Sequence, residues 1–217
     1  MKKTILSTLV MGLFATSAFA MGDKPQSDAA FSDKQVNHAQ ALIDNSWTQA
    51  DPKDRKRFVQ DKTQYLCSIY KDQPPADIAK HIVEMNKAVT SYPEGGITLG
   101  DWKAGEKLAN SGYGLRIGNI KADNPKKKPN GGNCYACHAM APSQAAAGNL
   151  GPSLANYGIR GTSDAMLKYT YQKIFNAQAT KACSNMPRFG YHGVLDDKQI
   201  ADIMAYMLDP NSPVNAK

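Results

Sequence analysis

Two cysteines separated by two residues, with a histidine directly after the second, constrain this chain more than any other feature. Cys134, Cys137 and His138 place two thiols and one imidazole on a single short turn. Two thiols at this spacing can each reach one of the two vinyl groups of a haem, while the imidazole binds the iron. The motif therefore predicts one covalently bound haem c, held by Cys134 and Cys137, with His138 as an axial ligand of the iron.

The same spacing also occurs in thioredoxin-like redox pairs and in one half of a zinc site. A zinc site needs a second pair at suitable spacing, but the other two cysteines, Cys67 and Cys183, stand far apart and alone. A thioredoxin-like pair follows a strand, whereas residues 129–133 read Pro-Asn-Gly-Gly-Asn, which is typical of a loop. The haem interpretation is the one that fits the surrounding sequence.

The first twenty residues have the features of a secretory signal peptide. Lys2 and Lys3 form a positively charged start, a mostly apolar stretch follows, and residues 18–20 read Ala-Phe-Ala, a small-residue cleavage site. We therefore expect export to the periplasm and cleavage near Ala20. No later stretch has the apolar length that a membrane span needs. Removal of the two lysines lowers the formal net charge of +7 by two, and the remaining basic residues are too dispersed to predict nucleic-acid binding.

The chain after the signal peptide (residues 1–20) divides at a turn that reads Tyr-Pro-Glu-Gly-Gly over residues 92–96. We predict a helical N-terminal extension over residues 21–96 and a haem domain over residues 97–217. In the haem domain, a short helix over residues 102–110 carries a glycine on its packing face, which allows another helix to cross closely. First and last helices cross in this way in small monohaem cytochromes. The predicted fold class is all-α, with a class I cytochrome c-like haem domain.

Capping residues and prolines predict where the other helices begin. Apolar residues at roughly helical spacing follow several of these starts, which supports a helical chain. The starts are expected at Ser32, at Asp51-Pro52 (a helix continuing to Cys67), at Pro74-Pro75, at Ser163 and at Asp196.

Two segments after the motif complete the predicted haem site. Pro152 and Leu154 belong to a Gly-Pro turn, in which a carbonyl would accept a hydrogen bond from His138 and Leu154 would cover the haem face. Met186 stands in a proline-stiffened loop before the last helix and is the expected sixth ligand of the iron, with His192 as the alternative. The other methionines are expected to lie in the core or too near His138: Met140, Met166, Met204 and Met207.

A histidine and a methionine as the two axial ligands predict electron transfer. The soft thioether raises the reduction potential relative to two histidines. A filled sixth position leaves no open site at the iron for a substrate, so we expect single electrons to be accepted and passed on without activation of oxygen.

Export also bears on the two cysteines outside the haem motif. Disulfides persist outside the cytoplasm, and Cys67 and Cys183 form an even remainder. One disulfide between them is expected, and two free thiols are the alternative that the sequence leaves open. A reactive thiol at either position would instead indicate a thiol-active protein.

Several stretches beyond the haem motif resemble SoxX, the monohaem cytochrome subunit of the SoxAX complex in bacterial thiosulfate oxidation. The resemblance covers the chain from about residue 55 onward. Its most particular parts are Met-Pro-Arg-Phe-Gly at residues 186–190 and the ending Leu-Asp-Pro-Asn-Ser-Pro-Val-Asn at residues 208–215. The other matching stretches are residues 100–106, 131–138 and 150–154.

This resemblance implies a role, partners and site residues. Cys134 and Cys137 would hold the haem, and His138 and Met186 would bind its iron, while no catalytic residue transfers to this chain. A SoxA-like partner would hold the cysteine at which thiosulfate is joined oxidatively to a carrier protein of the SoxYZ type. The complex would then be an L-cysteine S-thiosulfotransferase. This chain would accept the released electrons and pass them to a downstream cytochrome.

Two further expectations depend on the N-terminal extension. Some SoxX proteins carry cysteines where Cys67 and Cys183 stand here, and a bridge between them would tie the extension to the loop that contains Met186. A SoxX-like subunit can use residues 21–92 as an interface. A free-standing periplasmic electron shuttle, the alternative function, needs none of them.

Overall fold

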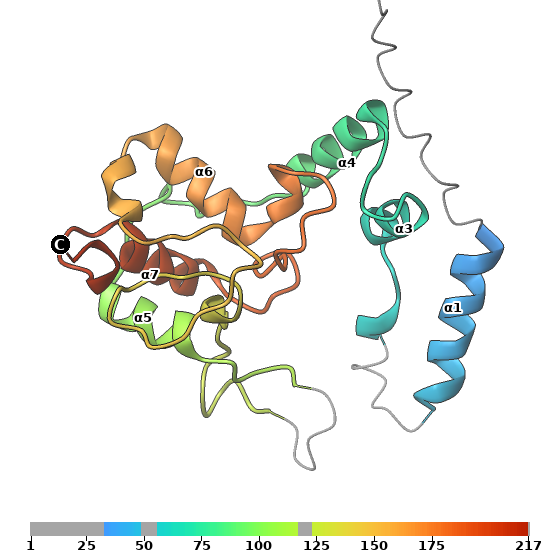
Figure 1. Ribbon diagram of the computed structural model, residues 1–217, viewed down its shortest axis with the longest axis horizontal. Helices are drawn as coiled ribbons and strands as arrows, with labels where there is room; N and C mark the ends of the chain where they lie inside the picture. Colours follow the sequence, from blue (N-terminus) through green and yellow to red (C-terminus); the bar gives the residue numbers. More distant parts are fainter. Residues whose placement is uncertain (1–32, 49–55, 117–122, 217) are drawn as a thin grey trace, which may run out of the picture.

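The computed structural model describes residues 33–48, 56–116 and 123–216, and every regular element within these ranges is a helix (Figure 1). The prediction of an all-α chain is confirmed. The α-helices are α1 (Asp33–Ser46), α3 (Lys62–Ile69), α4 (Ala76–Ala88), α5 (Trp102–Asn110), α6 (Asp164–Phe175) and α7 (Asp197–Leu208). Short 3-10 helices are η1 (Lys56–Phe58), η2 (Cys134–Ala136), η3 (Tyr157–Arg160), η4 (Ala177–Ala179) and η5 (Pro213–Asn215).

The haem domain is built around the crossing of α5 and α7. A Cβ atom built on Gly105 of α5 would stand 2.0 Å from the carbonyl oxygen of Asp202 in α7, so only a glycine permits this approach. Just before α5, the amide of Gly100 donates to the carbonyl of Ala201 at 3.0 Å, and the amide of Asp101 donates to Asp202 Oδ1 at 2.9 Å. The close crossing expected from the glycine is therefore present.

The main core lies between α5, α6 and α7, and capping residues set where the last two helices begin. Ser163 Oγ accepts a hydrogen bond from the amide of Met166 at the start of α6. Asp196 and Gln199 make both bonds of a capping box at the start of α7. Both predicted starts are confirmed. The largest buried core residues are Tyr171, Met140, Ile200, Ile203, Met204, Tyr206 and Val214.

The predicted helix ending at Cys67 is not continuous. After η1 the chain leaves the helical conformation, and α3 begins anew after Asp61. Asp61 Oδ1 accepts from the amide of Gln64 at 2.9 Å, and Gln64 Oε1 accepts from the amide of Asp61 at 2.9 Å. This complete capping box satisfies the donors of a helix start, so it favours a break where continuity was expected.

Some predictions fall on residues outside the described ranges. These are the signal peptide with its cleavage near Ala20, the helix start at Ser32 and the start at Asp51-Pro52. The third predicted start is confirmed, because α4 begins directly after Pro75. The boundary between residues 96 and 97 stays a prediction. Within the described ranges, no helix has both the length and the apolar character of a membrane span.

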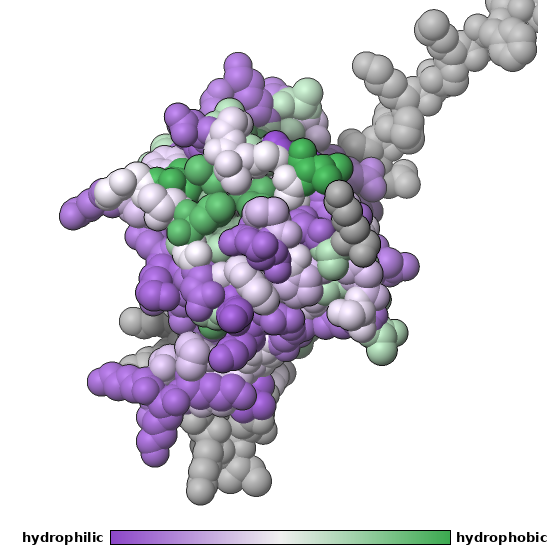
Figure 2. Space-filling model, turned by 90° about the vertical axis from the view of Figure 1, so that its left-hand side faces the viewer, coloured by the Kyte–Doolittle hydropathy of each residue, from purple (hydrophilic) through white to green (hydrophobic). Residues whose placement is uncertain are grey.

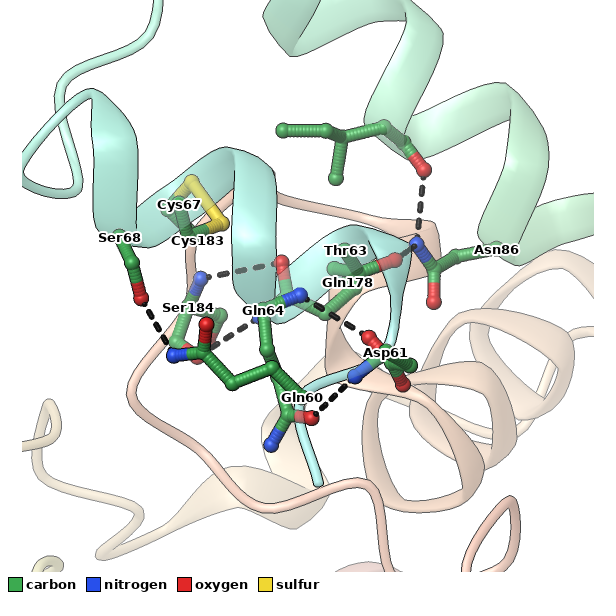
Figure 3. The surroundings of a disulfide bond; sticks show 11 residues. Gln60, Asp61, Thr63, Gln64, Cys67, Ser68, Asn86, Gln178, Cys183 and Ser184 are labelled. Carbon is green, nitrogen blue, oxygen red and sulfur yellow. Dashed lines mark hydrogen bonds between the residues drawn. A yellow bond between two sulfur atoms is a disulfide. The ribbon is translucent and has the colours of Figure 1, made fainter. Parts of the chain in front are cut away.

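The extension is joined to the haem domain by a second, smaller core. Cys67 of α3, Ile82 of α4 and Cys183 of the haem domain are buried together, and the two cysteines form a disulfide with their Cα atoms 5.4 Å apart (Figure 3). The disulfide that the sequence left open against two free thiols is therefore present. It ties α3 to the segment just before Met186.

Candidate haem site

A small cavity in the main core brings together part of the predicted haem site, while Cys137 and Pro152 do not line it. Cys134, His138 and Met186 line it, coming from the haem motif and from the loop before α7. The rest of the lining is hydrocarbon or thioether, which suits an apolar ring that must be shielded from water. These other residues are Met140, Leu154, Ile174, Phe189, Leu195, Ile203 and Met207.

His138 is oriented by a hydrogen bond to the backbone of the Gly-Pro turn. Its Nδ1 lies 2.7 Å from the carbonyl oxygen of Pro152. Because a carbonyl oxygen only accepts, Nδ1 carries the hydrogen and the lone pair is left on Nε2, the nitrogen that a metal needs. The carbonyl contact expected from the sequence is thus made by Pro152, and Leu154 lines the cavity as expected.

The turn itself is bound to the motif by backbone hydrogen bonds. Gly151 donates its amide to the carbonyl of Cys137 at 2.8 Å, and Leu154 donates to the carbonyl of Ala139 at 2.7 Å. A Cβ atom on Gly151 would lie 2.1 Å from Cε1 of His138. The imidazole therefore stands against bare backbone, which leaves no room for a side chain at position 151.

The two motif cysteines are free thiols, half-buried and not bonded to each other. Cys134 is the first residue of η2, and Cys137 directly follows its last residue. Asn133, just before η2, takes the left-handed conformation, with φ 47°. Burial raises the pKa of the Cys134 thiol to about 12. A thioredoxin-like pair needs an attacking thiol with a lowered pKa, so this environment does not suit redox exchange.

Three methionines line the cavity, and they differ in how they are held. Met207 belongs to α7 and Met140 follows the motif closely; both are buried in the main core. Met186 comes from a loop without regular helix and is only partly buried. Met207 was expected to serve only as core, yet it also lines the cavity. Assignment of Met186 as the sixth ligand stays a prediction, which the loop position favours.

Two other candidates lie away from the cavity. Met166 is partly buried, and its sulfur accepts a hydrogen bond from Thr170 Oγ1 at 3.7 Å. His192 is exposed and is not among the lining residues. Neither side chain therefore shares the cavity with His138 in the described structure.

One set of contacts was missed by the sequence reasoning. Arg188, two residues after Met186, forms an ion pair with Asp61 of the extension, with Nη2 2.5 Å from Oδ2. The pattern of Asp61 and Gln64 was readable as a capping box, but nothing in it pointed to a partner so distant in the chain. We call residues 183–190, which contain Cys183, Met186 and Arg188, the methionine loop.

The donor set and its surroundings fit a haem c. Both thiols and the imidazole, with its Nε2 free, belong to one turn, and Cys134, His138 and the thioether of Met186 line one apolar cavity. When bound, haem supplies an iron centre that can gain and lose one electron. Cys134 and Cys137 would hold it covalently, and His138 would bind its iron.

Comparison with known proteins agrees with this chemistry. Residues 121–209 match the family described as cytochrome c. Over 224 aligned residues the chain is 39% identical to a protein of Aquifex aeolicus (strain VF5) described as an uncharacterized lipoprotein, an alignment that covers 99% of this chain and 100% of the relative. The chain belongs to that protein's family and contains a cytochrome c domain. This domain implies a covalently bound haem c, as the motif predicted, and the fold class is all-α and class I cytochrome c-like.

Proposed function

We propose that the cytochrome c domain transfers single electrons with His138 and Met186 as the two axial ligands. One observation carries the proposal: imidazole and thioether line one apolar cavity, and Pro152 already orients the imidazole. A thioether ligand raises the reduction potential, and two protein ligands leave no open position for a substrate. The residues of this chain therefore bind, orient and shield the redox group without acting on a substrate themselves.

Replacing Met186 with alanine is expected to abolish the weak long-wavelength iron–sulfur absorption band of the ferric protein. The alanine side chain offers no sulfur, so the bond that produces the band cannot form. The optical spectrum of the purified holoprotein measures this directly. Met166→Ala is the matched control, because Met166 does not line the cavity, and it should keep the band.

Survival of the band in Met186→Ala would identify another sulfur as the ligand. Met140 and Met207 are then the remaining methionines of the cavity. Their alanine variants, measured in the same way, would show which one binds the iron. That result would overturn the assignment of Met186 and leave the covalent attachment at Cys134 and Cys137 untouched.

We further propose that this chain is the SoxX-like subunit of a SoxAX-type complex in thiosulfate oxidation. Support comes from the motifs at residues 186–190 and 208–215 and from exposed apolar surface. Leu42 of α1 is 54% exposed, and Trp47, just after the end of α1, is 42% exposed. On the face at the left of Figure 1, apolar residues gather between hydrophilic ones (Figure 2). Apolar areas with a polar border are typical of protein interfaces.

In this proposal the catalytic cysteine belongs to a SoxA-like partner. The complex is an L-cysteine S-thiosulfotransferase that acts on a carrier protein of the SoxYZ type, and this chain accepts the electrons that the reaction releases. A downstream cytochrome then receives them. The description of the relative as a lipoprotein supports an exported protein, and the signal-like pattern of the first twenty residues favours the periplasm.

The loop before the haem motif is suited to guide an acidic partner. Residues 124–129 are exposed and include Lys126, Lys127 and Lys128. At its start, the Arg116 guanidinium donates hydrogen bonds to Asp123 and holds the pKa of that carboxyl at about 2, well below its usual range. Lysines held near the haem motif would raise the rate of encounter with an acidic protein, at low salt most of all.

Isolation of the native complex separates the subunit from the free-standing shuttle. Co-purification with a second haem protein supports the subunit, and a monomer at working concentration supports the shuttle. Part of the extension already has an internal role, because α3 and α4 pack on the haem domain through the second core. Its presence alone therefore does not decide between the two functions.

A further inference from the structure

We propose that helix α3 of the extension is a splint that positions Met186 by holding the methionine loop at two points. This inference rests on the proposed role of Met186 as an axial ligand. One attachment lies three residues before Met186, at Cys183, and the other lies two residues after it, at Arg188. Both lead to α3 or to its N-cap residue, Asp61.

The first attachment is covalent. Cys67, in the last turn of α3, and Cys183 form the disulfide, and both cysteines are buried. Directly after it, Gln178 Nε2 donates to the carbonyl of Ser184 at 3.0 Å, and the amide of Ser184 donates to Gln178 Oε1 at 3.3 Å. The near end of the methionine loop is therefore fixed both to the extension and to the segment that follows α6.

The second attachment is ionic. Nη2 of Arg188 lies 2.5 Å from Oδ2 of Asp61, and the two side chains are only 6% and 31% exposed. The Arg188 guanidinium also lies over the ring of Tyr191, with Cζ 4.7 Å from the ring centroid. A charge pair that is largely removed from water and stacked on an aromatic ring is much less screened than a surface pair.

Helix α3 is itself fixed to the haem domain, so it can restrict the motion of the methionine loop. Asn86 Nδ2 of α4 donates to Thr63 Oγ1 of α3 at 2.9 Å, and Asn176 Nδ2 at the end of α6 donates to Asn86 Oδ1 at 2.9 Å. All three residues are buried, and Figure 3 shows the hydrogen bond from Asn86 to Thr63 in the surroundings of the disulfide. Removal of a buried partner would leave a costly unpaired group, so α3 is held in place independently of the loop.

Between the two attachments the methionine loop has little internal support. Besides the bonds between Gln178 and Ser184, the described side-chain bond near the ligand runs within the loop, from the amide of Met186 to Ser184 Oγ at 3.3 Å. A ligand on an unsupported loop must be ordered each time it binds, which weakens its bond to the metal. Two fixed points five residues apart reduce that freedom before the bond forms. Asp61 and Arg188 are therefore positioning residues for the thioether.

Asp61→Asn tests the ionic attachment without removing the helix cap. Asparagine is as good an N-cap as aspartate, so its amide oxygen can still accept from Gln64, while its amino group then faces the Arg188 guanidinium. We expect imidazole added to the ferric holoprotein to displace Met186 about tenfold faster, which corresponds to a displacement barrier lowered by about 1.4 kcal/mol when the loop loses one of its two fixed points. Loss of the iron–sulfur band reports the rate.

A double-mutant cycle shows whether the effect belongs to the pair. Arg188→Gln should accelerate displacement similarly, and the double variant should be no faster than either single one. Arg188→Lys keeps the charge and is expected to restore part of the wild-type rate. Glu84→Gln is the matched control: it removes a carboxylate of the same extension whose ion pair with Lys80 is exposed, and it should leave the rate unchanged.

Amide hydrogen exchange supplies a readout that does not depend on the iron. In Asp61→Asn, the amide of Met186 should exchange faster, while the amides of α7 keep their protection. An unchanged imidazole rate and unchanged exchange, in a protein where Met186→Ala abolishes the band, would overturn the splint and leave the axial ligand intact. A band that survives Met186→Ala would overturn the ligand assignment, and the splint with it.

Discussion

Replacing both Cys67 and Cys183 with alanine is expected to lower the free energy of unfolding by about 4–5 kcal/mol, the entropy that a cross-link of this span removes from an unfolded chain. The two cysteines are 116 residues apart in sequence, and the enclosed segment contains most of the described chain. Without the bond, the unfolded state regains that freedom while the folded contacts largely remain. Urea unfolding of the holoprotein, followed by circular dichroism and by haem absorption, measures the loss.

The wild-type protein in a strong thiol reductant provides the matched comparison. It should lose the same stability as the double variant, because both conditions open the same loop. A loss of less than about 1 kcal/mol would be far smaller than the loss of chain entropy predicts. It would show that the unfolded chain is already restrained, for example by compact residual structure.

The helix starts were predictable because capping is local. Asp101, Ser163 and Asp196 each accept a hydrogen bond from a backbone amide two or three residues later, at the start of α5, α6 and α7. Such a contact involves only neighbouring residues, so its pattern is readable in the sequence. The start of α3 is also marked by a local cap, at Asp61. We instead predicted a single helix from Asp51-Pro52 to Cys67, because proline is common at the first position of a helix.

The attachment of the extension was predictable only in part. The disulfide was expected because two cysteines remained after the haem motif, which is a counting argument that needs no geometry. The ion pair between Asp61 and Arg188 joins residues 127 positions apart, and no spacing rule links charges at that distance. The buried amides of Asn86 and Asn176 were missed for the same reason: burial is a property of the packed chain.

The haem site shows where sequence reasoning stops. The motif and the Gly-Pro turn are short segments close together in the sequence, so a hydrogen bond from His138 to a carbonyl of the turn could be predicted. The choice of sixth ligand depends instead on which side chains the fold turns towards one cavity. Met140, Met186 and Met207 all line it, although only Met186 was expected to do so. Loop position favours Met186 over the other two, and the support that we propose for α3 would distinguish it further.

Gly105→Ala is expected to destabilise the protein by about 1–3 kcal/mol, the usual cost of overpacking a well-packed interface. In an ordinary helix interior the same change would stabilise by about 1 kcal/mol, because alanine has the higher helix propensity. Here the added Cβ would stand 2.0 Å from the carbonyl oxygen of Asp202 and 2.5 Å from its carbonyl carbon. Both are backbone atoms, so α5 and α7 must move apart.

That movement should also reach the haem site, since Ile203 and Met207 of α7 line the cavity. We therefore expect the unfolding midpoint in urea to fall and the iron–sulfur band to weaken together. Lys107→Ala in α5 is the control: its side chain is exposed, and a change of more than about 0.5 kcal/mol would be unusual for such a position. A Gly105→Ala protein as stable as wild type would mean that the two helices do not cross this closely in solution, and the haem would then sit in a looser core than the structure describes.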